Sequence, residues 1–248
     1  MPYTLEVCVD SVESAVAAEK GGATRLELCA NLIIGGTTPT MALYEAVCEA
    51  VKLPVNVLIR PRFGDFLYTA SEYEIMRRDI SAFSSRGAHG IVTGALCADG
   101  SLDLDKMAGF LHAADGVPVT LHRAFDVCSN PLKALEQALD LGVDTILTSG
   151  QQATAWEGRS LIGTLLASAG NKAEILIGGG VNTSVIRDFR RLYPNANAFH
   201  LSGKTVLDSR MTYRNEAVHM GLPGISEFQL WRTNADAIQA ASEALREA

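Results

Sequence analysis

The segment Leu5-Glu-Val-Cys-Val9 opens a series of eight short, mostly apolar runs that alternate with longer stretches of helical periodicity. This alternation is typical of βαβ units, which place parallel strands side by side in one sheet. The runs are Leu5–Val9, Arg25–Cys29, Val55–Ile59, Gly90–Thr93, Pro118–His122, Thr145–Ser149, Ile175–Ile177 and Ala198–Leu201. Eight successive units predict closure of the sheet into a single-domain (β/α)8 TIM barrel that spans residues 1–248.

Length and composition agree with this architecture. The chain has 248 residues, of which 48% are hydrophobic and 20% charged, a balance that allows a large buried core. An open, doubly wound sheet is the alternative, but its first strand is usually followed by a Gly-rich nucleotide loop. Here the first strand is followed by Asp10-Ser-Val-Glu13, which contains no glycine. Among the helix ends, Ser71-Glu-Tyr-Glu74 predicts a capping box, and Asn130-Pro131 predicts an N-cap followed by proline.

The segment 204–233 looks irregular and precedes a final amphipathic helix, so we expect an excursion from the barrel there. Its large apolar residues are Met211, Met220, Leu222, Phe228, Leu230 and Trp231. An apolar excursion is typical of a subunit interface, although the segment could also fold back onto the barrel. We expect a homodimer.

Charge and cysteine content restrict the compartment and the partners. The net charge is −7 and no run of Lys or Arg occurs, which disfavours a nucleic-acid or anionic membrane surface. The first strand begins almost at Met1, and no apolar stretch reaches membrane-spanning length. The five cysteines are scattered and form no C-x-x-C pair, so we expect thiols rather than disulfides. These features predict a cytoplasmic protein.

Polar side chains break the apolar pattern of the strands in a consistent phase. Side chains alternate across a strand, so Glu6 shares a face with Cys8, and Arg25 and Glu27 share one with Cys29. In a TIM barrel the C-terminal strand ends form the mouth that holds active sites. We therefore predict that the mouth is lined by Glu6, Glu27, Arg60, His122 and His200 and extended by the loop residues Arg62, Asp65, Arg123 and Asp126.

Two interpretations fit this polar cluster. In the first, Glu6, Glu27, His122 and His200 are catalytic, with Glu27 or His122 as general base and His200 as acid. Gly178-Gly-Gly180 and Ser202-Gly203 follow strands after which many barrels bind phosphate. A small anionic ligand would then be held by Arg25, Arg60, Arg62, Arg123, Asp126, Gly179 and Ser202. In the second, the inward Arg and Glu side chains form a buried ion-pair network, and the glycines form tight turns.

The sequence resembles the CutC family in motifs that cover nearly the whole chain. These motifs are Leu5-Glu-Val-Cys-Val-Asp-Ser11, Arg25-Leu-Glu-Leu-Cys29, Gly35-Gly-Thr-Thr-Pro39, Arg60-Pro-Arg-Phe-Gly-Asp-Phe66, Val92-Thr-Gly-Ala-Leu96, His122-Arg-Ala-Phe-Asp126, Leu147-Thr-Ser-Gly150, Gly178-Gly-Gly-Val181 and Tyr213-Arg-Asn215. The resemblance implies a TIM barrel, a cytoplasmic location, an oligomer, and a role in copper homeostasis that includes copper binding.

Copper binding also has a chemical basis in the sequence. Cu(I) prefers soft thiolates, and Cys8 and Cys29 lie on matching faces at the ends of neighbouring strands. We therefore predict these two cysteines as Cu(I) ligands. Lone buried cysteines are also common packing residues, and the chain has no Cys-rich loop or Met cluster. The alternative function is that of a TIM-barrel enzyme acting on a small anionic or phosphorylated metabolite at the barrel mouth.

Overall fold

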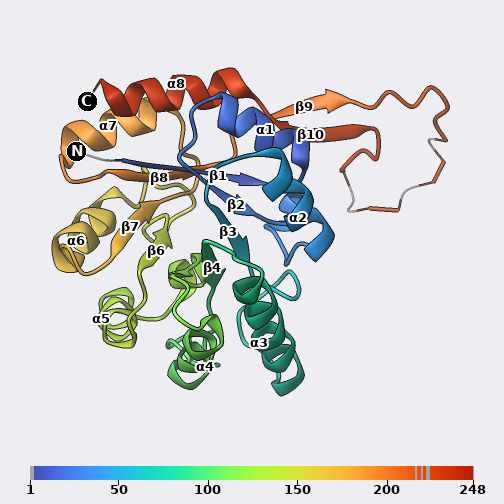
Figure 1. Cartoon of the computed structure of the whole chain (residues 1–248). Coiled ribbons are helices and arrows are strands. Elements are labelled where there is room, and N and C mark those ends of the chain that lie inside the picture. Colours follow the sequence, from blue (N-terminus) through green and yellow to red (C-terminus); the bar gives the residue numbers. More distant parts are fainter. Residues whose placement is uncertain (1–2, 216, 219, 222–223, 248) are drawn as a thin grey trace.

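The computed structural model describes residues 3–215, 217–218, 220–221 and 224–247. In this part of the chain, eight parallel strands form a closed barrel in sequence order, which confirms the predicted TIM barrel (Figure 1). The strands are β1 (Thr4–Val9), β2 (Arg25–Leu28), β3 (Val55–Leu58), β4 (Gly90–Thr93), β5 (Val119–Leu121), β6 (Thr145–Thr148), β7 (Glu174–Ile177) and β8 (Ala198–Leu201).

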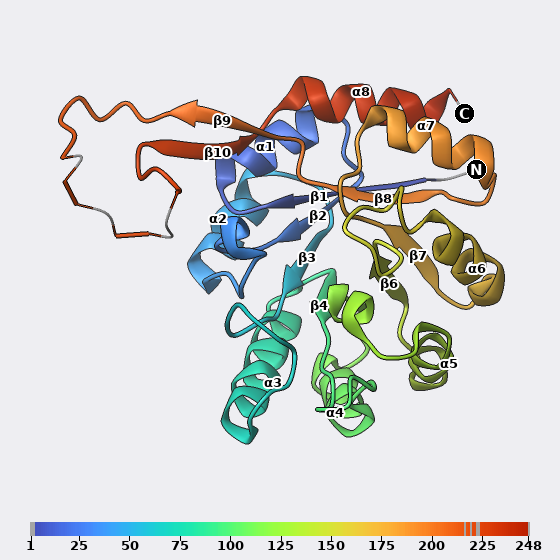
Figure 2. The ribbon, with the colours of Figure 1, turned by 180° about the vertical axis from the view of Figure 1, so that it is seen from behind.

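Helices surround the barrel and cover the outer faces of the strands (Figures 1 and 2). They are α1 (Val12–Lys20), α2 (Met41–Ala50), α3 (Ala70–Ser85), α4 (Leu104–Ala114), α5 (Pro131–Leu141), α6 (Arg159–Ala169), α7 (Thr183–Leu192) and α8 (Ala235–Arg246). Most begin at a side-chain cap that accepts a first-turn N–H. None of the helices in the described ranges is both long and apolar enough to cross a membrane.

The start of α3 differs from the expectation. The structure places the capping box at Thr69 and Glu72, two residues before the predicted Ser71–Glu74 pair. Asn130 caps α5 and Pro131 occupies its first turn, as predicted.

The strands bury both faces, but the two faces differ in character. Outward side chains such as Leu5, Val7 and Leu26 are fully buried in the main core between barrel and helices. Inside the barrel, Leu147 and Leu176 pack together on β6 and β7. Buried polar side chains of β1, β2 and β3 lie in the same interior, and they position the site described below.

The two ends of the segment 204–233, where an irregular excursion was expected, form the paired strands of a hairpin. β9 (Lys204–Asp208) pairs antiparallel with β10 (Gln229–Thr233), with Val206 opposite Trp231. The hairpin extends well beyond the barrel in both views (Figures 1 and 2). Leu222, one of the apolar residues noted in this segment, lies outside the described residues.

Candidate functional site

A cavity of about 490 Å³ opens at the C-terminal end of the barrel. Residues from five strands and from the hairpin enclose it, and this side of the barrel is where TIM-barrel sites occur. The polar and sulfur-containing residues that line it include Cys8, Asp10, Glu27, Cys29, Arg60, His122, Arg123, Asp126, His200, Ser202, Lys204 and Arg232. The structure thus brings Glu27, Arg60, His122 and His200 together at the mouth.

Glu6 does not line this cavity, contrary to the expectation, because it lies one level deeper in the barrel. It is opposite Arg25 on β2 and opposite His200 on β8 in the strand register. Its carboxylate accepts hydrogen bonds from Arg25 Nε at 2.6 Å and from Asn56 Nδ2 at 3.2 Å, and contacts His200 Nδ1 at 2.9 Å. Arg25 also pairs with Glu174 at 3.1 Å. Arg25 therefore belongs to a buried ion-pair chain below the mouth.

This chain of charges sets the electrostatics of the cavity floor. Burial opposes ionisation of Glu6, but His200 and Arg25 outweigh it and lower the pKa of Glu6. Burial alone would lower the pKa of His200, yet Cys8, Glu6 and Glu27 together raise the pKa well above its ordinary value. Glu27 lies 3.7 Å from His200 Nε2, and burial raises its pKa to about 7, with Glu6 adding to the effect. The floor therefore combines an imidazolium with a carboxyl group that titrates near neutrality.

The thiol of Cys8 lies beside these two groups. Ligand atoms of Cys8, Glu27 and His200 all lie within 4.8 Å of one another. The register places Cys8 opposite Glu27, so Cys29 is two residues farther toward the mouth rather than level with Cys8. Both thiols nevertheless line the cavity and belong to one small buried cluster with Leu58 and Val92. Burial, with Glu27 and Cys8 nearby, raises the pKa of Cys29 well above its ordinary value.

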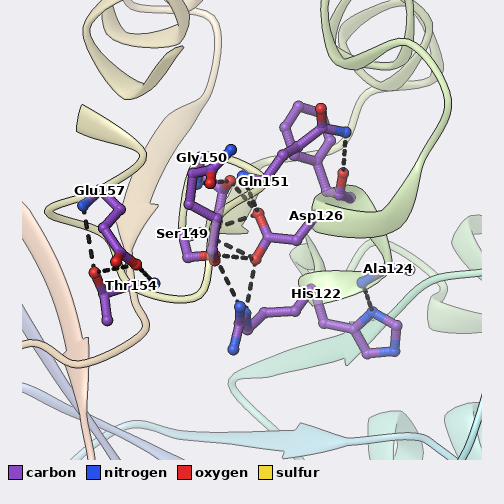
Figure 3. Close-up of polar contacts among 12 residues, drawn as sticks. His122, Ala124, Asp126, Ser149, Gly150, Gln151, Thr154 and Glu157 are labelled. Atoms are coloured by element: carbon purple, nitrogen blue, oxygen red, sulfur yellow. Dashed lines mark hydrogen bonds and ion pairs between the residues drawn. The ribbon is translucent and has the colours of Figure 1, made fainter. Parts of the chain in front are cut away.

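Asp126 anchors the rim of the cavity (Figure 3). It accepts hydrogen bonds from Thr148 Oγ1 at 2.6 Å and from the backbone N–H groups of Ser149 and Gln151 at 3.0 and 3.2 Å. Arg123 Nε also donates to it at 2.7 Å, and Arg123 Nη2 donates to Ser149 Oγ at 2.8 Å. These bonds fasten the short 3-10 helix Arg123–Val127 to the loop after β6, so Asp126 positions the Arg123 guanidinium at the rim.

Besides Arg25, two more of the predicted ligand-binding residues, Arg62 and Gly179, do not line the cavity. Arg62 points away from the mouth, because its Nε donates to the capping-box residue Glu72 at 2.6 Å and its Nη2 to Asp65 at 3.0 Å. Gly179 has a φ of 95° and approaches Ser149 so closely that an added Cβ would lie 2.9 Å from the Ser149 Cβ. A tight, left-handed turn explains this glycine. Ser202 does line the cavity.

Comparison with known proteins identifies the family of the chain. A sequence model of the CutC family matches residues 3–205. The chain belongs to the CutC family. A human relative named copper homeostasis protein cutC homolog is 43% identical over 240 residues, which cover 96% of this chain and 87% of the relative. A CutC family protein of Histophilus somni (strain 2336) is 40% identical over 243 residues, which cover 98% of this chain and 99% of the relative.

Solved structures support the same assignment. The crystal structure of a CutC protein from Streptococcus agalactiae matches with a TM-score of 0.76 and 29% identity, and the match covers 81% of this chain and 98% of that chain. The region matched by the CutC family model includes all eight barrel strands and therefore every cavity residue that the strands contribute.

Part of the cavity lining was missed from the sequence. The hairpin contributes Lys204, Trp231, Arg232 and Thr233 to the wall. Lys204 Nζ lies 3.4 Å from the centroid of the Trp231 ring, a cation–π contact that joins β9 to β10 beside the mouth. The sequence signal for Lys204 as a cavity residue was its position directly after the Ser202-Gly203 turn. Trp231 was expected only at a subunit interface. Trp231 and Arg232 lie beyond the region that the CutC family model matches.

Proposed function

We propose that this protein binds Cu(I) at the floor of the barrel mouth and acts in copper homeostasis, as the names of its CutC relatives indicate for them. The observation that carries the proposal is the group formed by Cys8, His200 and Glu27, whose ligand atoms lie within 4.8 Å of one another. The ligands are the thiolates of Cys8 and Cys29 and the imidazole of His200.

The chemistry of these donors suits Cu(I). Thiolate is the soft ligand that Cu(I) prefers, and imidazole is a common second donor. Glu6 contacts His200 Nδ1 at 2.9 Å, which leaves Nε2 directed to the side of Glu27 and Cys8. A carboxylate behind a metal-binding imidazole fixes the ring and raises its basicity. Glu6 is therefore a positioning residue, and Arg25 holds Glu6 in turn.

Metal binding at this floor displaces protons. The thiol of Cys29 is held protonated by burial, and His200 is held protonated by its anionic neighbours. Both must lose a proton to coordinate a metal. Glu27, with a pKa of about 7, is placed to accept one of these protons. Carboxylate oxygen is a hard donor and suits Cu(I) poorly, so Glu27 acts as a proton acceptor rather than as a metal ligand.

The test is an anaerobic Cu(I) competition titration against a colorimetric chelator under reducing conditions. Cys8→Ser and Cys29→Ser should each weaken Cu(I) binding by about tenfold or more, because each removes a soft ligand. Cys48→Ser is the matched control, since Cys48 is an exposed thiol on α2 and should bind the metal no differently from the parent. Unchanged affinity in both the Cys8 and the Cys29 variants would refute the proposed site.

The proposal includes a cytoplasmic homodimer. All five cysteines are free thiols, which suits a reducing compartment and Cu(I) as the oxidation state. The β9–β10 hairpin exposes apolar side chains that include Val206, Leu207, Met211 and Leu230, and a second copy of the chain would cover them. Light scattering at micromolar concentration tests this assembly, and a monomer mass would reject it.

A second candidate function is catalysis on a small anionic metabolite. The observation that favours it is the set of cations on the cavity wall, formed by Arg60, Arg123, Lys204 and Arg232. Glu27 suits a general base better than His122 does, because the pKa of Glu27 is about 7 whereas burial and Arg60 lower the pKa of His122 to about 3. Thiol blocking separates the two functions, since metabolite binding should survive it and Cu(I) binding should not.

A further inference from the structure

His122 holds one hydrogen-bond donor for which the described residues provide no acceptor. Its Nδ1 accepts the backbone N–H of Ala124 at 3.2 Å, so Nδ1 carries no hydrogen (Figure 3). Burial and the nearby charge of Arg60 lower the pKa of His122 to about 3, so the ring is neutral and its single N–H is on Nε2. The side chain is buried, and Nε2 has no hydrogen-bond partner within the described part of the chain.

Arg60 presents a buried positive charge that pairs with no carboxylate of the described residues. It is 9% exposed, and its Nη atoms donate to the carbonyl groups of Gly35, Gly36 and Gly64 at 3.1, 3.1 and 2.8 Å. Within the described ranges, Arg60 forms no ion pair with an acidic residue. Tyr68 lies nearby, but burial raises its pKa to about 12, so the phenol is neutral and does not balance the charge.

The two groups face one part of the cavity. Both line it, and the ring of Phe66 lies between them, with its centroid 5.0 Å from Arg60 Cζ and 4.8 Å from the centroid of the His122 ring. Gly94 directly follows β4, and a Cβ added to it would lie 2.8 Å from His122 Nδ1. Because Gly94 has no side chain, the His122 ring can pack directly against the backbone at this position.

We propose that Arg60 and His122 form a subsite for the carboxylate of a small organic acid, separate from the thiol floor of the same cavity. A buried N–H without an acceptor and a buried guanidinium without a counter-ion are both unfavourable, so an anionic oxygen that contacts both groups would stabilise them. One orphan N–H donor and one positive charge match a carboxylate better than a phosphate, which needs more donors. Phe66, Leu32 and Leu58 supply an apolar wall for the rest of the ligand.

This subsite shares the cavity of the proposed copper function but does not depend on Cu(I). Its carboxylate has two possible sources, a free organic acid or the acid group of a small molecule that carries the metal. The experiments below separate these sources from each other and from the copper proposal.

The probe is benzoate, with benzamide as the neutral control of nearly the same shape. In titrations followed by NMR, benzoate should shift the Nε2–H signal of His122, and benzamide should bind at least tenfold more weakly because it lacks the charge. This measurement on the parent protein needs no variant. Equal binding of benzoate and benzamide, or benzoate binding that leaves the His122 signal unmoved, would overturn the subsite.

Two substitutions at His122 form a matched pair. His122→Asn retains an acceptor at the position of Nδ1 for the Ala124 N–H but removes the donor at Nε2, and should weaken benzoate binding about tenfold. His122→Gln places an amide N–H near the position of Nε2 and should restore most of the affinity. Equal losses in both variants would indicate a packing role alone and would contradict the proposal.

The same titration with Cys8→Ser and with Cu(I)-loaded parent protein separates the remaining outcomes. Benzoate binding that is unchanged by Cys8→Ser supports the subsite even if the copper proposal fails. Tighter benzoate binding in the Cu(I)-loaded protein indicates a carboxylate that travels with the metal, whereas equal affinity indicates a free acid. Loss of benzoate binding in Cys8→Ser would contradict a subsite separate from the thiol floor.

Discussion

Replacing Glu27 by Gln should change how the stability of the barrel depends on pH. Burial and Glu6 raise the pKa of Glu27 from its ordinary value of 4.5 to about 7. Since the folded state holds this proton more tightly than the unfolded state, stability from this group is complete below pH 4.5 and is lost as pH rises through about 7. One pKa unit is about 1.36 kcal/mol, so the full loss is about 3 kcal/mol.

Urea unfolding of the parent and of Glu27→Gln, each at a series of pH values from 4.5 to 8, measures this contribution. Gln has the same shape and does not titrate, so the variant should lack the decline that Glu27 causes. The difference in unfolding free energy should therefore be small at the acid end and should favour the variant by about 3 kcal/mol at the alkaline end.

Other groups titrate in both proteins, so the comparison depends on the difference between the two curves. His200 is present in both proteins, and Cys8, Glu6 and Glu27 raise its pKa well above the ordinary value. Parallel pH profiles, with a constant difference between parent and variant, would refute the assignment of a raised pKa to Glu27. A difference in unfolding free energy that increasingly favours Glu27→Gln as the pH falls would contradict the upward direction of the pKa shift.

Three further predictions concern the barrel and the hairpin. Glu6→Gln should cost about 3–5 kcal/mol in urea unfolding, because it leaves Arg25 and a buried imidazolium without their shared anion, whereas Glu174→Gln at the more exposed end of the chain should cost about 1 kcal/mol or less. Equal costs would contradict the central place of Glu6. Gly94→Ala should displace the His122 ring and shift its NMR signals, and unshifted signals would show that the wall has room for a methyl group. Leu207→Glu should convert the proposed homodimer to a monomer in light scattering, and an unchanged dimer mass would show that the hairpin does not form the interface.

The barrel and the inward phase of its polar residues could be predicted from the sequence because side-chain alternation along a strand is fixed by its geometry. The register between strands could not be predicted, since it depends on the relative position of neighbouring strands along their axes. Cys8 and Cys29 share the inward phase, but the register sets Cys8 beside Glu27 and places Cys29 two residues farther on. The same limitation hid the depth of Glu6, which the phase alone assigned to the mouth.

Local patterns also left choices that only packing resolves. Thr69-Ala-Ser-Glu72 and Ser71-Glu-Tyr-Glu74 both have the spacing of a capping box, and the structure uses the first. That choice engages Glu72 with Arg62 and turns Arg62 away from the mouth. The hairpin escaped prediction because neither of its strands has a buried face, so both lack the apolar alternation that reveals a strand.

The central claim is that Cu(I) is held at the mouth floor by cysteine sulfur together with the imidazole of His200. X-ray absorption spectroscopy at the copper edge, on protein loaded with one equivalent of Cu(I), tests it directly. We expect a first shell that contains both sulfur and imidazole nitrogen, with a sulfur contribution that falls in Cys8→Ser and an imidazole contribution that disappears in His200→Ala. A first shell without sulfur, or one identical in the parent and in both variants, would contradict the claim.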